Sequence, residues 1–480
     1  MSSQIPVHQI DPNTDGPSDN KKKKPETVEL YASRKKIYVR EIKGLFQRIR
    51  NVSLTALMGM YFLFVWITVD GDPLIHFDLP AREFHLYGMT FFPQDFFLLA
   101  AMLIICAFGL FFITTLFGRV WCGYTCPQTV WTFIFMWVEE RIEGSRNKRM
   151  KLDKQPNSPE KVARKSAKHA VWLLIALATG VTFVGYFYPI RELLADLATL
   201  NANGWAYFWV GFFTVATYLN AGWMREQVCL YMCPYARFQS VMFDRNTRVV
   251  SYDPNRGEPR GSRKKSANRE DLGLGDCIDC GLCVQVCPTG IDIRDGLQYE
   301  CIGCALCIDA CDSVMDKMEY PRGLIRYTTE NELEGRPSKL LRPRTFGYGA
   351  LLMLMIGAVA FTIATRVPVE LDVIRDRGAM FSYNGNGWVE NTYTLKIQNM
   401  SEEAREFTIQ VEGIESARLL RGGEPVSVVA GDNKAVPVVV EVDPEDLKDI
   451  NTGISFRIEA VDDLDVADET DSQFIGPRPR

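Results

Sequence analysis

The chain contains Cys277-Ile-Asp-Cys280-Gly-Leu-Cys283-Val-Gln-Val-Cys287-Pro288 and then Cys301-Ile-Gly-Cys304-Ala-Leu-Cys307-Ile-Asp-Ala-Cys311-Asp312. Each half has the spacing C-x2-C-x2-C-x3-C, which wraps a cubane iron-sulfur cluster and sends its fourth cysteine to the neighbouring cluster. A zinc ribbon would need two C-x2-C pairs with a longer spacer, and a disulfide framework would need an oxidising compartment. The spacing therefore predicts two [4Fe-4S] clusters. The expected ligands are Cys277, Cys280, Cys283 and Cys311 for one cluster, and Cys301, Cys304, Cys307 and Cys287 for the other.

Three residues within these motifs affect the path of the backbone. Gly281 and Gly303 are expected to let the chain curl close to the cluster, because glycine accepts conformations that other residues avoid. Asp312 stands where proline is usual in this pattern. A carboxylate there would lower the potential of the nearer cluster, but we expect a solvated turn residue instead.

The composition indicates a membrane protein with soluble parts. The 480 residues suffice for two to four domains, and the net charge of -5 is unremarkable. A mean hydropathy of -0.06 conceals strongly apolar segments that alternate with charged ones. All 13 cysteines lie between Cys106 and Cys311. The thiols and clusters are therefore expected on one side of a membrane, with the tail free to lie on the other.

Several apolar runs approach the roughly 20 residues that a bilayer core requires. The first 49 residues are polar and basic and contain no apolar core of a signal peptide, so we expect the first run to be an uncleaved transmembrane helix. An odd number of spans would put the two termini on opposite sides. The five expected spans are 52–69, 95–117, 170–189, 205–224 and 347–366.

The loop cations predict an orientation. Segment 118–168 carries eleven Lys and Arg residues, whereas 70–94 and 190–204 carry one arginine each. By the positive-inside rule, the amino terminus and the cluster-bearing segment 225–345 are cytoplasmic, and 367–480 is periplasmic. The expected location is the bacterial inner membrane.

The last segment has the pattern of a β-domain. Apolar residues alternate with period two between turns rich in Gly, Asn, Pro and Asp. About 110 residues of such strands fit an immunoglobulin-like β-sandwich without the disulfide. The alternating runs are Tyr393, Leu395 and Ile397; Phe407, Ile409 and Val411; Val438, Val440 and Val442; and Ile454, Phe456 and Ile458.

The fold class that follows is a multi-domain membrane protein. An α-helical membrane bundle of about five spans is combined with a bacterial-type two-[4Fe-4S] ferredoxin domain and a C-terminal immunoglobulin-like β-sandwich. The expected parts are a basic cytoplasmic segment 1–49, membrane helices 50–245, the ferredoxin domain 246–345, a fifth membrane helix 346–367 and the sandwich 368–480.

A second constellation repeats within the membrane part. The chain reads Cys122-Gly-Tyr-Thr-Cys126-Pro127 after the second span and Cys229-Leu-Tyr-Met-Cys233-Pro234 after the fourth, which indicates an internal duplication. If helical, each motif would carry both thiols on one face. Because proline favours the first turn of a new helix, the second cysteine of each motif is expected near the positive end of a helix dipole. Such thiols suit redox chemistry and soft metals; the alternative is four buried, inert cysteines.

The source of electrons is not contained in the chain. No G-x-G-x-x-G stands between a strand and a helix and no P-loop is present, so electrons must come from another protein or from a membrane quinol. The basic stretch from Arg256 to Arg269 would suit an acidic donor or anionic lipid, but we expect a solvated linker there. Membrane lipid is an expected partner, and nucleic acid is not.

The paired C-x3-C-P motifs, the two-cluster segment, the further span and the outer β-domain together resemble the FixG/RdxA/CcoG family of cytochrome c oxidase accessory proteins. The resemblance covers nearly the whole chain from about residue 30. It implies a membrane ferredoxin-type cupric reductase that supplies Cu(I) for assembly of cbb-type cytochrome c oxidase, with copper chaperones or oxidase assembly factors as partners and a homodimer as an option. The family's cluster ligands fall on the eight cysteines named above. Its membrane thiols, which would be catalytic and would bind copper, fall on Cys122, Cys126, Cys229 and Cys233.

Two other functions fit the same motifs. The chain is also similar to membrane ferredoxin subunits that take electrons from quinol to another redox protein, and such a subunit would work without binding copper. A non-catalytic scaffold would use the β-domain to hold an oxidase subunit, and it would not need the clusters.

Overall fold

The structure is a computed structural model. It describes residues 36–69, 72–80, 82–87, 89–92, 95–267, 269, 271–376, 378, 380–401, 403–447 and 449–477. The chain divides into Met1–Ile37 and Tyr38–Arg480, and nearly all described residues belong to the second unit. Most of the basic segment expected over 1–49 lies outside the described residues.

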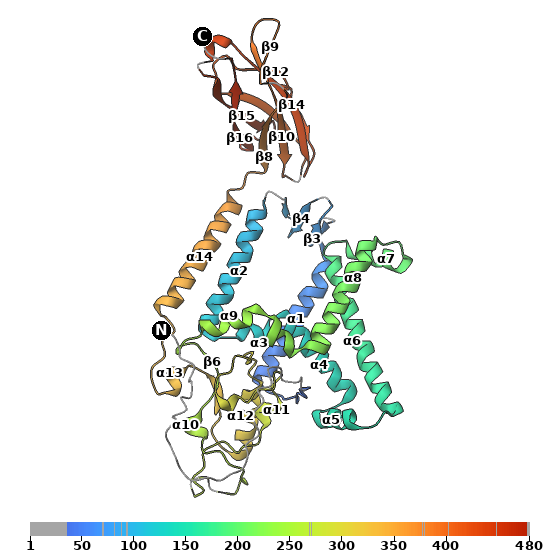
Figure 1. Cartoon of the computed structure of the whole chain (residues 1–480), viewed down its shortest axis with the longest axis vertical. Coiled ribbons are helices and arrows are strands. Elements are labelled where there is room, and N and C mark those ends of the chain that lie inside the picture. Colours follow the sequence, from blue (N-terminus) through green and yellow to red (C-terminus); the bar gives the residue numbers. More distant parts are fainter. Residues whose placement is uncertain are drawn as a thin grey trace, which may run out of the picture. The chain divides into compact units, whose positions relative to one another are not determined.

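Four helices in the described part of the chain are long and apolar enough to cross a membrane. Large apolar side chains cover their surfaces, for example Leu103 (63% exposed) on α2 and Met353 (68%) on α14. Lipid can cover such a surface and water cannot. Figure 1 shows α2 and α14 side by side, and the two helices are in contact. The four helices are α1 (Leu45–Leu63, continued by η1, Phe64–Trp66), α2 (Phe96–Phe117), α6 (Pro159–Gly185) and α14 (Pro343–Ala364).

The span expected at 205–224 is divided between two elements. The α-helix α8 (Gly204–Thr217) continues directly into the π-helix η3 (Tyr218–Met224), and the two together cover the length of the expected span. The helix expected from residue 170 begins earlier, because Ser158 caps α6 through the Lys161 amide and Pro159 occupies its first turn. The first turns of α6 are polar, so the apolar run from residue 170 does not reveal where the helix begins.

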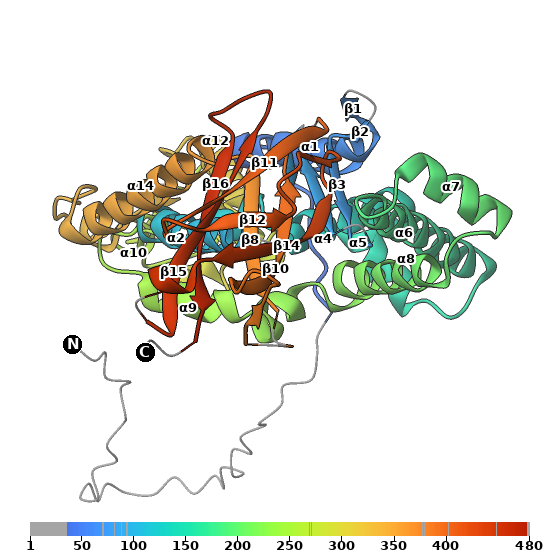
Figure 2. The same cartoon turned by 90° about the horizontal axis from the view of Figure 1, so that it is seen from above.

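Short elements connect the membrane helices. Figure 2 shows α6, α7 and α8 grouped together, and α6 contacts both of the others. Between α1 and α2, the described residues form two small antiparallel sheets, one of two strands and one of three. The connecting helices are α3 (Val120–Tyr124), α4 (Pro127–Glu143), α5 (Arg146–Lys154), α7 (Ile190–Thr199), η4 (Val228–Met232) and α9 (Pro234–Met242). The strands are β1 (Thr68–Val69), β2 (Asp72–Pro73), β3 (Ile75–Asp78), β4 (Glu83–Leu86) and β5 (Met89–Phe91).

The cysteine-rich segment folds around two helices and a strand pair. Strand β6 (Val249–Tyr252) pairs antiparallel with β7 (Ile325–Thr328), and helix α11 (Leu282–Gln285) packs on α12 (Leu306–Met318). Asp312 lies within α12, where its carboxylate accepts a hydrogen bond of 3.0 Å from the Gly323 amide. The expectation of a solvated turn residue is therefore wrong. The remaining elements are α10 (Pro254–Gly257), η5 (Ile293–Asp295) and α13 (Glu330–Leu333).

The last part of the chain is a sandwich of two antiparallel sheets, which confirms the expected immunoglobulin-like fold. One sheet has the order β12-β14-β10-β8, with β9 beside β10, and the other has the order β13-β11-β15-β16. Tyr393 and Phe456 meet between the sheets with ring centroids 4.9 Å apart, and the alternating apolar residues form the core. The strands are β8 (Val369–Arg375), β9 (Ser382–Tyr383), β10 (Val389–Asn399), β11 (Arg405–Glu412), β12 (Arg418–Arg421), β13 (Val426–Val428), β14 (Asn433–Val442), β15 (Asn451–Ala460) and β16 (Ala467–Ile475), with η6 at Pro444–Asp446.

Candidate functional site

Two cavities lie within the cysteine-rich segment, and each is surrounded by one of the expected ligand sets. Apolar side chains complete both walls, among them Leu324 at the first cavity and Val250 at the second. Cys283 borders both cavities, so they are neighbours. The first cavity is lined by Cys277, Cys280, Cys283 and Cys311, and the second by Cys287, Cys301, Cys304 and Cys307.

The backbone curls in the same way in both motifs. Asp279 (φ 51°) and Gly281 (φ 64°) in the first motif correspond in position to Gly303 (φ 66°) and Ala305 (φ 58°) in the second. All four residues are left-handed, a conformation that is strained for Asp and Ala. The curl expected at the two glycines is confirmed. This curl lets three successive cysteines, each three positions after the one before, border the same cavity.

Seven of the eight cysteines that line these cavities are buried or partly buried, and Cys280 is exposed. Burial raises the pKa of Cys301 to about 12 and that of Cys311 to about 12, so these thiols hold their protons until a metal displaces them. Eight thiols around two apolar cavities are a donor set that fits two [4Fe-4S] clusters. When bound, such clusters store and pass single electrons.

Each C-x3-C-P motif spans a break between two helices. Cys126 precedes α4 and Cys233 precedes α9, and the following proline occupies the first turn of each helix. The prediction that these prolines begin new helices is confirmed. The two thiols of a motif do not share a helix face, because proline holds the preceding cysteine out of the helical region, at ψ 127° and 111° respectively.

The four thiols of the two motifs are brought together. Burial, together with the electrostatic effect of Cys126, Cys229 and Cys233, raises the pKa of Cys122 to about 12. Burial also raises the pKa of Cys229 to about 12. The Cys122 thiol donates a hydrogen bond to Gln239 over 3.3 Å. Within the described ranges, no three His, Cys, Asp or Glu side chains form a site for a single metal ion.

Two buried arginines join this thiol site to the second cluster cavity. Arg50 of α1 donates to the backbone carbonyls of Cys304 and Gly123. Arg119 donates to the carbonyls of Cys301 and Ala236, the latter in α9. The positive charge of Arg119 therefore acts on both sets of sulfurs, and that of Arg50 acts on Cys304. The sequence does not reveal the role of either arginine, because each is a single cation whose hydrogen-bond acceptors lie far away along the chain.

The basic stretch from Arg256 to Arg269 is neither a linker nor a free patch. Arg256 and Arg269 both pair with the buried carboxylate of Asp276, next to the first cluster ligand. Arg263 donates to the Gly275 carbonyl over 2.7 Å. The solvated linker that we expected is therefore wrong at these positions, since the cations fix the loop ahead of Cys277.

The sequence suggests that His76 and His85 are two isolated surface residues of a loop. They lie instead opposite each other on β3 and β4. Their rings stack with centroids 6.1 Å apart, and His76 is buried. Only the strand register reveals this pair, and the register cannot be read from two separate histidines.

Three family models match the chain. A model described as a 4Fe-4S dicluster domain matches residues 224–330, and one described as a 4Fe-4S binding domain matches residues 99–141. The third matches residues 359–477 and describes an immunoglobulin-like fold at the C-terminus of FixG, with a suggestion of oxidoreductase activity.

The chain is similar to known proteins along most of its length. It is 39% identical to the nitrogen fixation protein FixG of Rhizobium meliloti over 451 residues, which cover 86% of this chain and 85% of that protein. It is 41% identical to protein RdxB of Cereibacter sphaeroides over 420 residues, covering 84% and 87% of the two chains. A crystal structure of a FixG-related protein from Vibrio parahaemolyticus is 30% identical, with a TM-score of 0.21, and covers 22% of this chain and 95% of the other.

Proposed function

Because this chain belongs to the FixG/RdxA/RdxB family of membrane iron-sulfur proteins, we propose that it is an oxidoreductase that reduces Cu(II) to Cu(I). The Cu(I) is supplied to the assembly of a cbb-type cytochrome c oxidase. Copper is the substrate, and Cys122, Cys126, Cys229 and Cys233 form the site where it is reduced.

One observation carries this proposal: Cys122 of the first motif and Cys229 of the second, about one hundred residues apart, both lie beside the second cluster cavity. Cys122 packs against the core that contains Cys304. A small pocket is lined by Cys229 together with Thr289 and Ile302, which belong to the wall of the second cavity. Electrons stored in the cubanes would therefore have a short path to these thiols.

The chemistry of the site favours the reduced metal. Copper(I) is soft and prefers thiolate, whereas copper(II) prefers nitrogen and oxygen ligands. A thiol site that binds the product more tightly than the substrate draws the reduction forward. Arg119 adds a positive charge that favours thiolate at Cys122 and Cys229 when copper arrives.

The test is single-turnover copper reduction by anaerobically purified protein that has been reduced and freed of reductant. Wild-type protein should produce about two Cu(I) per chain, since each of two cubanes yields one electron, and a Cu(I)-specific chelator reports the product. The double variant Cys126→Ser/Cys233→Ser should lose at least ten-fold in rate. Cys106→Ser, on the exposed face of α2, is the matched control. Undiminished reduction in the double variant, with clusters intact by electron paramagnetic resonance, would remove these thiols from the mechanism.

We also propose the bacterial inner membrane as the location, with the cysteine-rich segment cytoplasmic and the β-sandwich periplasmic. The loop cations support this orientation, and it puts the clusters in the reducing compartment. A copper chaperone or an oxidase assembly factor would then take the Cu(I). Protease added to intact spheroplasts should remove the sandwich and leave the cysteine-rich segment whole, and the opposite pattern would reverse the topology.

A further inference from the structure

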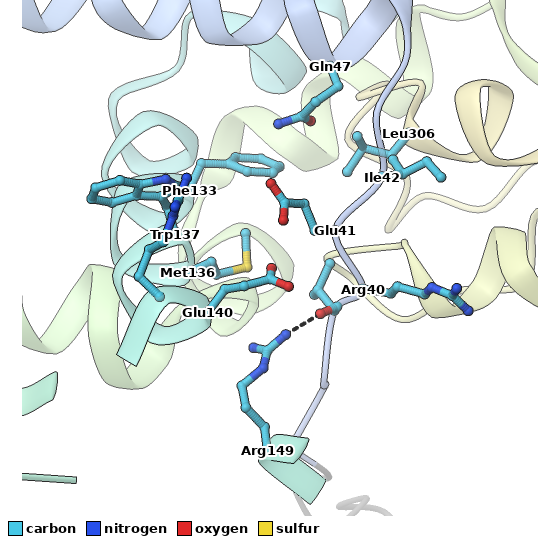
Figure 3. A pocket seen from close by; sticks show the side chains of 12 residues that line it. Arg40, Glu41, Ile42, Gln47, Phe133, Met136, Trp137, Glu140, Arg149 and Leu306 are labelled. Atoms are coloured by element: carbon cyan, nitrogen blue, oxygen red, sulfur yellow. Dashed lines mark hydrogen bonds between the residues drawn. The ribbon is translucent and has the colours of Figure 1, made fainter. Parts of the chain in front are cut away.

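A pocket that is partly open to solvent lies between α4, the segment before α1 and the first residue of α12. Phe133, Met136 and Leu306 supply apolar walls. Figure 3 shows the carboxyl groups of Glu41 and Glu140 pointing into the same space. Apolar walls with two convergent carboxylates fit a flat, uncharged molecule that can release protons.

The walls of this pocket are held in place by hydrogen bonds. The Arg40 amide donates to the Gln285 carbonyl over 2.9 Å, which ties the segment to the cysteine-rich part. On the other side, Arg146 donates to the Tyr38 carbonyl over 2.9 Å and Arg149 donates to the Val39 carbonyl. The segment is thus fixed on both sides, so the pocket is a built feature of the fold.

The pocket lies one layer of side chains from a cluster ligand. Leu306, which is 3% exposed, lies in sequence between Cys304 and Cys307. Ile42 and Phe133 line the pocket and also pack against the buried core that contains Cys304. A donor in the pocket would be close enough to deliver electrons to the second ligand set.

The pocket also adjoins the first turn of a candidate membrane helix. Gln47, one of its lining residues, belongs to the first turn of the membrane helix α1. On the same helix, Leu45 and Ile49 are exposed, and Trp137 of α4 is 56% exposed. Tryptophan is enriched where a membrane meets water. A molecule dissolved in the bilayer can therefore approach this site.

We propose that this pocket binds the head group of a membrane quinol and that the quinol is the electron donor. This inference rests on the proposed function, because it supplies the electrons for copper. Oxidation of one quinol to quinone breaks two O–H bonds and releases two protons and two electrons. The two clusters that the cysteine sets would hold would each accept one electron, and the protons pass through Glu140 and the exposed Glu41 to water.

Two charge features suit this reaction. Burial raises the pKa of Glu140, and the nearby Glu41 raises it further, which makes Glu140 a stronger base. The buried Arg50 guanidinium lies at the carbonyl of Cys304. Positive charge beside a cluster raises its reduction potential toward the range in which a quinol can reduce it.

Photolabelling tests the location. Full-length protein in nanodiscs is irradiated with a short-chain azidoquinone, and the labelled peptides are identified by mass spectrometry. Label should appear within 38–47 or 127–143, and decylubiquinone should compete it away. Met136→Trp, which fills the pocket, should abolish the label. Label on other segments only, or label that persists in Met136→Trp, would overturn the proposal.

Anaerobic stopped-flow tests the chemistry. Decylubiquinol should bleach the clusters of the oxidised protein with a saturable rate, and Glu140→Gln should slow this at least ten-fold while reduction by dithionite stays unchanged. Glu160→Gln, an exposed ion-paired glutamate on α6, should match the wild type. Clusters that dithionite reduces and quinol does not would overturn the quinol site, although copper reduction by the pre-reduced protein would still support the proposed function. Quinol oxidation without copper reduction would support the quinol site and overturn the proposed function.

Discussion

A β-carbon on Gly123 would lie 2.9 Å from the carbonyl oxygen of Gly303, a distance that real side chains do not tolerate. Gly123 belongs to the first C-x3-C-P motif, and Gly303 lies between two ligands of the second cluster cavity. Gly303 is itself left-handed, and a β-carbon on it would lie 3.0 Å from the Arg119 carbonyl. The thiol site and the cluster loop therefore touch backbone to backbone, which only glycine allows.

Replacement of Gly123 by alanine should push α3 away from the cluster loop. We expect a loss of stability of about 1–3 kcal/mol, typical of overpacking, and at least a ten-fold slower single-turnover reduction of copper. Gly109→Ala, on α2 with no atoms near its added carbon, should leave the rate unchanged. Equal rates in the two variants would show that this contact does not set the path from cluster to thiol.

Replacement of Arg50 by glutamine should lower the reduction potential of the second cluster. Arg50 is 2% exposed, and its charge lies against the Cys304 carbonyl and over the Phe133 ring at 4.5 Å. Removing a positive charge beside a cluster stabilises the oxidised form. A redox titration followed by electron paramagnetic resonance measures the shift. Arg48→Gln, an exposed neighbour on α1, should leave the potential unchanged, and an equal shift there would mean that the effect is not local.

Local patterns predicted much of this fold, and contacts between distant residues account for what they missed. The spacing from Cys277 to Cys311 is enough to foresee two ligand sets, and period two is enough to foresee the sandwich. The sequence does not show that Cys122 and Cys229 meet, since helix packing decides it. It also does not show the pocket between Glu41 and Glu140, because one wall is an irregular segment before α1. The sequence predicts only one side of the helix break at Thr125. Pro127 indicates where the new helix begins, but no residue indicates where the preceding helix ends.

Removal of the clusters should unfold one part of the chain and spare another. The core around Cys277, Cys283 and Met315 contains the ligands themselves, so loss of metal leaves cavities where the clusters were. The β-sandwich has its own core and contains no cysteine. After treatment with ferricyanide and an iron chelator, hydrogen exchange should rise over α11 and α12 and stay low over β10 and β15. A rise in the sandwich as well would show that the two parts depend on each other.

A buried ionic cluster fixes the two halves of the membrane part to each other. Glu139 of α4 is 1% exposed, and it pairs with Arg149 at 3.2 Å, with Arg225 at 2.9 Å and with Lys168 of α6 at 3.6 Å. Arg225 lies four residues before Cys229. The cluster therefore helps to place the second thiol motif beside the first.

Replacement of Glu139 by glutamine should leave three buried cations short of one negative charge. Removing one partner from a buried ion pair costs about 3–5 kcal/mol, so thermal unfolding in detergent should shift clearly downward. Glu160→Gln removes the exposed pair with Arg164 at 2.8 Å, which should cost less than about 0.5 kcal/mol. Copper reduction should fall in Glu139→Gln at temperatures where the protein is still folded, because Arg225 no longer holds the loop that leads to Cys229. Destabilisation with full activity would show that the ionic cluster supports the bundle without positioning the thiols.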